Sequence, residues 1–512
     1  MIRRYHDGTK HHFHRFARSL GYLDWASQPN PFRSFDGAPI VLLPPHPAAL
    51  PTPSPIGEIL RHALGLTAWK AFRGSRWALR ANPSSGNLHP TEAFIVAAAI
   101  EGVTSVPGVW HYASDRHAIE RRCRFASEAI DDHRFFVVLT SIHWREAWKY
   151  GERGFRYCQH DLGHAIAALS FAAALAGWQA VLRPEWSHSE IAALAGIDRD
   201  RDYIEAEREE PGALLEMTDA ATAPLTDDAR LALLEAVRSG AWTGRASQLS
   251  EDHVQWTFID EIAAATRDPG RQYSFGPSLL PPSHPALSAA ARPAPVILKR
   301  RSAVAFDARS SVPREHFEDM LRSVMPDRAA PWPTLWWSAR IHLALFVHRV
   351  VGIEPGLYLL LREPESGERL KAALGRDFLM EPVTSGLPLL LLARGDCRAL
   401  ARRISCDQDI AADGFFSLGM VAEFDQSLAA FGDSFYRHLF WETGVVGQAL
   451  YLAAEATGAR ATGIGCFYDD PVHDVLGLTG HTFQSLYHFS VGRPVEDERL
   501  TTSPGYEWEA AG

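Results

Sequence analysis

The sequence predicts an α+β fold that contains two tandem copies of one unit. Residues 155–177 recur without a gap as residues 436–458. The matching pairs are Phe155-Arg156 with Tyr436-Arg437, Asp161 with Glu442, Gly163 with Gly444, Leu169 with Leu450, Ala172-Ala173 with Ala453-Ala454, and Gly177 with Gly458. Both copies are rich in alanine and leucine and lack proline, so each predicts a long buried helix that ends at a glycine.

Each copy also carries strand signals ahead of its helix. The tetrapeptide Pro-Gly-Val-Trp at 107–110 has a counterpart, Pro-Gly-Leu-Tyr, at 355–358, and each follows an apolar run suited to a strand. The second copy has extra residues between this landmark and its helix. We therefore expect strands followed by a long core helix in each copy, with the copies packed as an internal pseudodimer in a monomeric protein.

Two proline-rich stretches, 41–56 and 275–296, lack a sustained helix or strand pattern. The second lies near the centre of the 512-residue chain. Single cores rarely grow beyond about 250–300 residues, so a division is expected there. We predict an N-terminal domain over 1–270 that includes an arm over 1–56, a linker over 271–296, and a C-terminal domain over 297–512.

Composition argues against several classes of protein. Lys+Arg 51 against Asp+Glu 61 gives a net charge of −10, which disfavours a nucleic-acid or membrane-surface binder. The apolar run 165–182 is interrupted by Ser170, Gly177 and Gln179, so it predicts a buried helix and no membrane span. The five cysteines include no Cys-x-x-Cys pair, and no apolar stretch follows the basic N-terminus, so we expect a cytoplasmic protein without a bound metal.

Two polar segments carry candidate binding chemistry. Residues 82–92 form a proline-fixed loop whose amides, hydroxyls and carboxamide suit the polar edge of a flat heterocycle. Residues 299–307 contain two adjacent arginines and a serine, which suit a phosphate because arginine donates bidentate hydrogen bonds. The alternative for residues 82–92 is a turn with a helix cap. The alternative for residues 299–307 is a solvated basic cap on the linker.

Together with two further segments, these motifs resemble the FMN-dependent nitroreductase family. The resembling segments are Pro83-Ser84-Ser85-Gly86-Asn87 before a strand, Arg300-Arg301-Ser302 with Phe306-Asp307, Thr462-Gly463-Ile464-Gly465-Cys466, and Val491-Gly492-Arg493-Pro494. The N-terminal motifs YHDGTK, YLDW and QPNPF and residues 148–157 are most similar to the SagB-type azoline dehydrogenases of that family. The resemblance extends over most of both halves.

The resemblance implies an FMN site that takes ligands from both copies. The implied phosphate ligands are Arg300, Arg301, Ser302 and Arg493; the implied ring contacts are Pro83, Ser84, Ser85, Asn87 and His89, with the backbone near Gly465 approaching flavin N5. The counterpart of the ring loop, 331–335, lacks the serines and the asparagine, and the counterpart of the arginine segment, 32–36, has one arginine fewer. We predict one FMN per chain and a second, degenerate site filled by Trp332, Trp336 and Trp337.

The SagB-type branch needs a base, and Lys149-Tyr150 match the Lys-Tyr pair that serves there. Otherwise Lys149 is a solvated helix-start lysine and Tyr150 a packed aromatic residue. We predict an FMN-dependent oxidoreductase that oxidises a small-molecule or peptide substrate by hydride transfer to flavin N5, with O2 as the final acceptor. The alternatives are an NAD(P)H-dependent reductase of nitro compounds or quinones, and a non-catalytic flavin-binding or scaffold protein.

Overall fold

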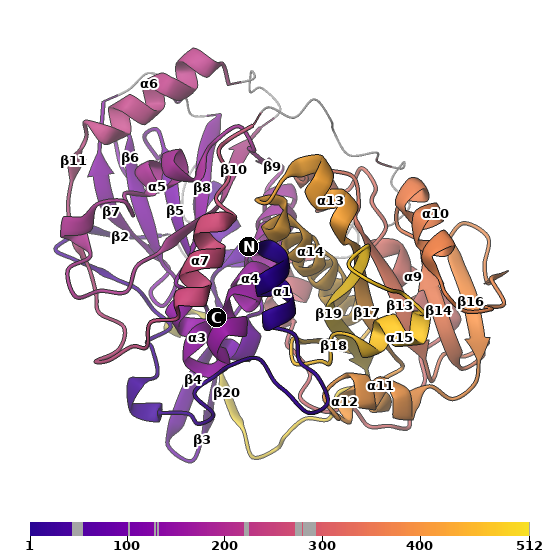
Figure 1. The fold of residues 1–512 in the computed structure, drawn as a ribbon. Coiled ribbons are helices and arrows are strands. Elements are labelled where there is room, and N and C mark those ends of the chain that lie inside the picture. The colour runs from indigo at the N-terminus through magenta and orange to yellow at the C-terminus, as the bar shows by residue number, and fades with distance from the viewer. Residues whose placement is uncertain are drawn as a thin grey trace. The chain divides into compact units, whose positions relative to one another are not determined.

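The computed structural model describes residues 1–43, 55–100, 103–126, 130, 133–219, 225–271, 279 and 293–510. Most of both proline-rich stretches, and most of the predicted linker, lies outside the described residues. The chain divides into two compact units, whose elements are labelled in Figure 1. Unit 1 comprises Met1–Arg18, Pro277–Trp332 and Trp337–Arg499, and unit 2 comprises Ser19–Gly276, Pro333–Trp336 and Leu500–Gly512.

Unit 2 is built on an eight-stranded antiparallel sheet. Its strands in sheet order are β11 (Ala241–Trp242), β7 (Ala118–Arg124), β6 (Gly108–Ala113), β5 (Thr91–Ala97), β8 (Arg134–Ser141), β10 (Glu210–Thr218) and β9 (Gln179–Leu182), with β2 (Ile40–Leu42) beside β7. Smaller sheets pair β1 (Phe35–Asp36) with β12 (Arg245–Ala246), and β3 (Leu66–Phe72) with β4 (Ser75–Arg80) and β20 (Thr501–Ser503). The helices are α2 (Pro55–Ala63), α3 (His143–Tyr150), α4 (Gly154–Leu175), α5 (His188–Ala195), α6 (Asp227–Arg238) and α7 (Thr257–Ala265).

Unit 1 contains a seven-stranded antiparallel sheet with the same central order. Its strands are β15 (Glu381–Pro382), β16 (Leu389–Arg394), β14 (Gly356–Leu360), β13 (Ile341–Val347), β17 (Phe416–Glu423), β19 (Phe483–Gly492) and β18 (Arg460–Ile464). The helices are α1 (Ile2–Gly8), α8 (Pro293–Lys299), α9 (Arg314–Ser323), α10 (Pro364–Ala373), α11 (Arg398–Ile404), α12 (Ile410–Asp413), α13 (Phe424–Phe431), α14 (Phe435–Ala456) and α15 (Pro471–Leu476). The two sheets share one connectivity, so the predicted α+β duplication is confirmed.

The two long helices of the repeat, α4 and α14, are labelled in Figure 1; each is 22 residues long and almost entirely buried. Each is followed by a glycine with positive φ, Gly177 at 77° and Gly458 at 75°, a conformation that favours glycine at a helix end. The apolar run 165–182 is therefore not one helix: it is helical to Leu175 and then forms β9. Within the described residues, no helix is long and apolar enough to cross a membrane.

Each sheet is buried on both faces. In unit 2, α4 packs against β5, β8, β9 and β10 on one face. Phe94 and Val96 of β5 point to the other face and join a core with Ile191 of α5 and Leu233 of α6, because alternate residues of a strand point to opposite sides. Unit 1 has the corresponding core under α10, α11 and α15. These layers hold the loops at the strand ends in fixed positions.

The terminal segments are grouped differently from the domains predicted from the sequence. Residues 1–18 belong to the unit formed by the C-terminal half, and residues 500–512 belong to the unit formed by the N-terminal half. In unit 1, His6 Nε2 lies 2.9 Å from Gln484 Oε1. In unit 2, Tyr506 Oη donates to the Ser114 carbonyl at 2.7 Å. Each unit thus includes a piece of the opposite end of the chain.

Candidate functional site

The serine-rich loop of unit 2 is anchored to α4 by a buried acid. Ser85 donates from its backbone N and from its Oγ to Asp161 Oδ1, both at 3.0 Å. Ser84 Oγ accepts the backbone N–H of His89 at 2.8 Å. Pro83 is buried ahead of these contacts, and Gly86 is exposed at the tip with a φ of 60°. The loop therefore has one defined shape that ends at the start of β5.

The side-chain amide of Asn87 ties the loop to β4 and also bonds within the loop. Its Nδ2 donates to the Ala78 carbonyl at 2.9 Å, and its Oδ1 lies 3.1 Å from His89 Nε2. Burial, followed by the charges of Arg80 and Arg145, holds the pKa of His89 well below its ordinary value, so this imidazole is neutral at pH 7. In this conformation Asn87 and His89 build the loop, and their contact with a flavin ring stays a prediction.

Lys149 and Tyr150 lie directly against the tip of this loop. They occupy the last turn of α3 and are half-buried, so Lys149 is not a solvated lysine at a helix start. A Cβ added to Gly86 would lie 2.7 Å from Tyr150 Oη and 3.3 Å from Lys149 Nζ. Tyr150 packs on the Tyr157 ring, with centroids 4.4 Å apart. The structure thus brings the predicted base and the predicted ring loop together within unit 2.

Two buried carboxyl groups that the sequence reasoning missed lie beneath this cluster. Burial raises the pKa of Asp161 to about 7, although hydrogen bonds from Ser84 and Ser85 oppose the shift. Burial and then the charge of Asp161 raise the pKa of Glu146 well above its ordinary value, while Lys149 opposes this shift. Neither Glu146 carboxyl oxygen has a hydrogen-bond partner in the described part of the chain. Both carboxyl groups therefore hold their protons to a higher pH than an exposed acid, and Asp161 titrates near pH 7.

The repeat-related acid of unit 1, Glu442, has a different environment. It forms an ion pair with Arg362 at 2.6 Å, and both side chains are 0% exposed. It also accepts the backbone N–H groups of Arg340 and Ile341, as Asp161 accepts that of Ser85. Ser114 follows β6 where Arg362 follows β14, so the corresponding position in unit 2 carries no cation. The buried acid is neutralised by an arginine in unit 1 only.

In unit 1, the arginine segment runs beside β18. Ser302 bridges Ala461 of β18, and its Oγ lies 2.9 Å from Tyr451 Oη. Tyr451 Oη also accepts the backbone N–H of Gly463 at 2.9 Å. The Arg300 guanidinium lies over the Tyr451 ring, 5.0 Å from its centroid. These contacts fix the arginine segment against α14 and β18, which both belong to the duplicated unit.

This part of unit 1 gathers positive charge in a poorly solvated place. Burial lowers the pKa of Arg300, and burial followed by the charges of Arg300 and Arg460 lowers the pKa of Arg301 to about 10. Glu455 lies among them, and burial raises its own pKa. Arg460 pairs with Glu496 at 2.5 Å and lies 3.8 Å from Glu455, so three guanidinium groups face two carboxylates, and the excess positive charge suits a bound anion. Arg460 was missed from the sequence, where only its position two residues before Thr462 could have pointed to it.

Gly465 and Arg493 lie at the ends of the neighbouring strands. Gly465 follows β18 and is half-buried, and Arg493 follows β19 with an exposed side chain. The Arg493 carbonyl accepts the backbone N–H of Asp307 at 3.1 Å, so the arginine segment that carries Arg300 also reaches this strand end. Five of the predicted site residues, Arg300, Arg301, Ser302, Gly465 and Arg493, therefore belong to unit 1. The other seven predicted site residues, Pro83, Ser84, Ser85, Asn87, His89, Lys149 and Tyr150, lie in unit 2.

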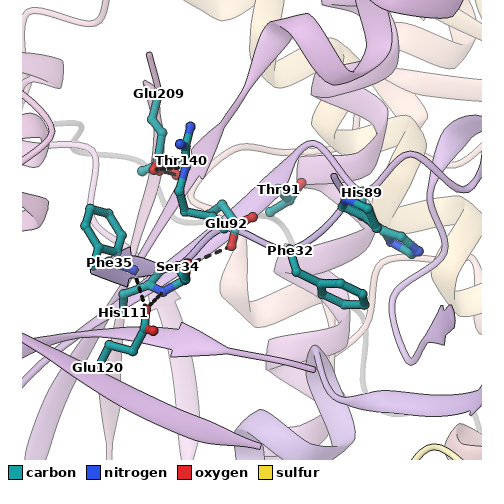
Figure 2. A network of polar contacts seen from close by, with 12 residues as sticks. Phe32, Ser34, Phe35, His89, Thr91, Glu92, His111, Glu120, Thr140 and Glu209 are labelled. Carbon is teal, nitrogen blue, oxygen red and sulfur yellow. Dashed lines mark hydrogen bonds and ion pairs between the residues drawn. The ribbon is translucent and has the colours of Figure 1, made fainter. Parts of the chain in front are cut away.

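The counterpart of the arginine segment in unit 2, residues 32–36, has a structural role. The Arg33 guanidinium is fully buried, lies 3.6 Å from Glu209, and donates to the Glu207 carbonyl at 2.5 Å. The backbone N of Phe35 donates to Glu120 at 3.1 Å, beside His111 (Figure 2). Burial lowers the pKa of His111, but hydrogen bonds to Glu120 and Glu92 raise it overall to about 9, so the charges of this network are compensated internally.

Tryptophans occupy the counterpart of the ring loop. Trp332, Trp336 and Trp337 are all buried. Trp337 Nε1 donates to Glu442 at 3.0 Å, and Arg362 lies over the Trp332 ring. The degenerate second site stays a prediction, but Trp332 and Pro333 stand here where the other loop has Ser84 and Ser85. Over the described ranges, no three His, Cys, Asp or Glu side chains gather in a way that could hold a metal ion.

Comparison with known proteins identifies the family. The model of the nitroreductase family matches residues 47–205 and 352–493. A protein of Methanocaldococcus jannaschii whose name assigns it to the nitroreductases is 25% identical over 202 residues, which are 40% of this chain and 83% of that protein. A crystal structure from Anabaena variabilis, also titled as a nitroreductase, aligns with a TM-score of 0.71 and 21% identity over 96% of this chain and 99% of that chain. The chain belongs to the nitroreductase family.

Proposed function

We propose that this protein is an FMN-dependent dehydrogenase that oxidises a small or peptidic substrate. One observation carries the proposal beyond the family: Lys149 and Tyr150 lie against Gly86, at the tip of the loop that is predicted to contact the flavin ring. A reductase that only passes hydride between a nicotinamide and a second substrate needs no base. A dehydrogenase that removes a proton together with a hydride does need one, and a lysine at this place could supply it.

The residues present fit the phosphate end of FMN. Arg300 is buried and Arg301 is half-buried, and burial together with the charge of Arg460 lowers the pKa of each, so a dianionic phosphate would stabilise this cluster. Arg300, Arg301 and Ser302 would hold that phosphate. Bound FMN would supply the hydride acceptor of the reaction and pass the electrons on to a second substrate. That the same FMN also takes contacts from the loop of unit 2 stays a prediction from the sequence.

The chain's own residues would divide the remaining work. Asp161 fixes Ser84 and Ser85, so the loop presents one surface to a bound ring. Lys149 Nζ would accept the proton that leaves the substrate carbon as the hydride departs from the neighbouring atom. Burial and then the charge of Asp161 raise the pKa of Glu146 well above its ordinary value, which disfavours a competing negative charge beside that lysine. Tyr150, whose ring centroid lies 5.2 Å from Lys149 Nζ, would stabilise the ammonium that forms once this amine has accepted the proton.

A substrate test separates this function from its alternatives. A short peptide with one thiazoline ring, incubated in air with the FMN-loaded protein, should lose about 2 Da as two hydrogens leave the ring. NADPH added without oxygen should leave the flavin oxidised. Rapid bleaching of the flavin by NADPH, with no change in the peptide, would favour the NAD(P)H-dependent nitro or quinone reductase. Absence of retained FMN would favour the scaffold alternative.

A further inference from the structure

Two cysteines of unit 1 that play no part in the proposed function lie in direct contact. Cys466 follows β18, and Cys406 lies in the turn after α11. Their Sγ atoms are 3.1 Å apart, although the residues are 60 positions apart in the chain. Both residues are half-buried, and neither takes part in a disulfide. Tertiary structure alone brings this pair together, because the sequence shows no Cys-x-x-Cys motif.

The backbones on both sides of the pair are tied to each other. Gln408 Nε2 donates to the Cys466 carbonyl and to the Ser405 carbonyl, both at 2.8 Å. The backbone N of Tyr468 donates to the Ile404 carbonyl at 2.9 Å. Cys406 itself has a φ of 54°, which is uncommon for a residue with a side chain. The two thiols are therefore held in place before any bond forms, and little chain entropy remains to be lost on closure.

The other three cysteines contrast with this pair. Cys123 and Cys158 are buried, and burial raises the pKa of Cys123 to about 12 and that of Cys158 well above its usual range. Cys397 is half-buried, but its Sγ contacts the Gly395 carbonyl at 3.6 Å and no other sulfur atom in the described residues. A thiol that forms an intramolecular disulfide must be accessible to the oxidant and lie next to a second thiol. Only Cys406 and Cys466 combine the two conditions.

We propose that Cys406 and Cys466 are a redox site that forms a reversible intramolecular disulfide with peroxides or small disulfides. With hydrogen peroxide, one thiolate attacks an oxygen and becomes a sulfenic acid with loss of hydroxide; the second thiol displaces water, so two thiols and one peroxide give one disulfide and two waters. With glutathione disulfide, two exchange steps give the protein disulfide and two molecules of glutathione. The bond would fix the loop after β18, which carries Gly465, to the turn after α11.

Thiol counting on the full-length protein tests this site. The reduced protein is treated with glutathione disulfide, its remaining thiols are blocked under denaturing conditions, and its peptides are mapped. Wild type should fall from five reactive thiols to three and yield a peptide cross-linked between Cys406 and Cys466. Cys397→Ser, in the same unit, should form the same cross-link. Dithiothreitol should reverse it.

Single variants of the pair make the test decisive. In Cys406→Ser, the thiol of Cys466 should instead carry one glutathione, which shows that it is accessible but lacks its partner. Cys466→Ser should give the corresponding adduct on Cys406. The inference is overturned if wild type keeps five thiols under conditions that glutathionylate either variant. It is equally overturned if neither variant takes up glutathione and no cross-link forms in wild type, or if the disulfides join different cysteines or different chains.

Discussion

Asp161 and Glu442 occupy repeat-related positions in different environments. We therefore predict that replacing each acid by its amide changes the free energy of unfolding in opposite directions. Asp161 has a pKa of about 7 in the folded protein, against 3.8 for an ordinary aspartate. The folded state therefore holds one more proton than the unfolded state between about pH 4 and pH 7. The free energy of unfolding therefore falls as the pH rises through this interval, and the full loss from ionising Asp161 is reached above pH 7. A shift of this size corresponds to about 4 kcal/mol.

Asp161→Asn removes the titrating group and keeps an oxygen that can accept from Ser85. We expect the variant to exceed wild type in free energy of unfolding by up to about 4 kcal/mol at pH 8, with the difference fading near pH 4. The matched control is Glu442→Gln, which leaves the Arg362 guanidinium buried without its counter-ion. That change should cost about 3–5 kcal/mol at pH 8.

Urea denaturation at pH 5 and pH 8, followed by tryptophan fluorescence and circular dichroism, measures both variants. The comparison of each variant with wild type at the same pH removes contributions that the two proteins share. A destabilised Asp161→Asn at pH 8, or an advantage that grows as the pH falls, would refute the reasoning. Equal effects of the two substitutions would mean that the ion pair of Glu442 does not distinguish the two sites.

Three other substitutions test the proposed roles. Arg300→Ala should weaken FMN binding about 10- to 100-fold by isothermal titration, since it removes a charge-assisted contact, and unchanged affinity would refute its role. Lys149→Met should lower the rate of thiazoline oxidation about 10²–10⁴-fold with unchanged FMN content; a colourless variant would instead indicate a structural role. Gly463→Ala should lower the free energy of unfolding by about 1–3 kcal/mol, because its Cβ would overlap Tyr487 Oη, and an unchanged urea midpoint would contradict this.

The duplicated architecture could be predicted because its signals are local. The helices α4 and α14 follow from an apolar pattern without proline, and their ends follow from Gly177 and Gly458, whose positive φ the structure shows. Pattern alone did not separate β9 from the end of α4, because both are apolar and a single glycine divides them. The grouping of residues 1–18 with the C-terminal half depends on contacts such as His6 with Gln484, which no local pattern encodes.

The candidate site could be predicted only in part. Motifs identified the loop at 83–87 and the arginines at 300 and 301, whereas the proximity of Gly86 to Lys149 is a tertiary property. Glu146 sits three residues before Lys149, yet nothing in the sequence shows that it is buried without a hydrogen bond. Asp161 was visible in the repeat, but its raised pKa depends on the missing cation that Glu442 has in Arg362. The burial of these carboxyl groups and the charges around them depend on the folded structure, so their pKa shifts could not be predicted from the sequence.

The ratio of FMN to protein tests the central claim most directly. Apo-protein titrated with FMN should bind one molecule per chain, and both Arg300→Ala in unit 1 and a Ser84→Ala, Ser85→Ala double variant in unit 2 should weaken that same binding event. A ratio of two per chain, no binding at all, or binding that is indifferent to the residues of one unit would contradict a single FMN that depends on both halves of the sequence.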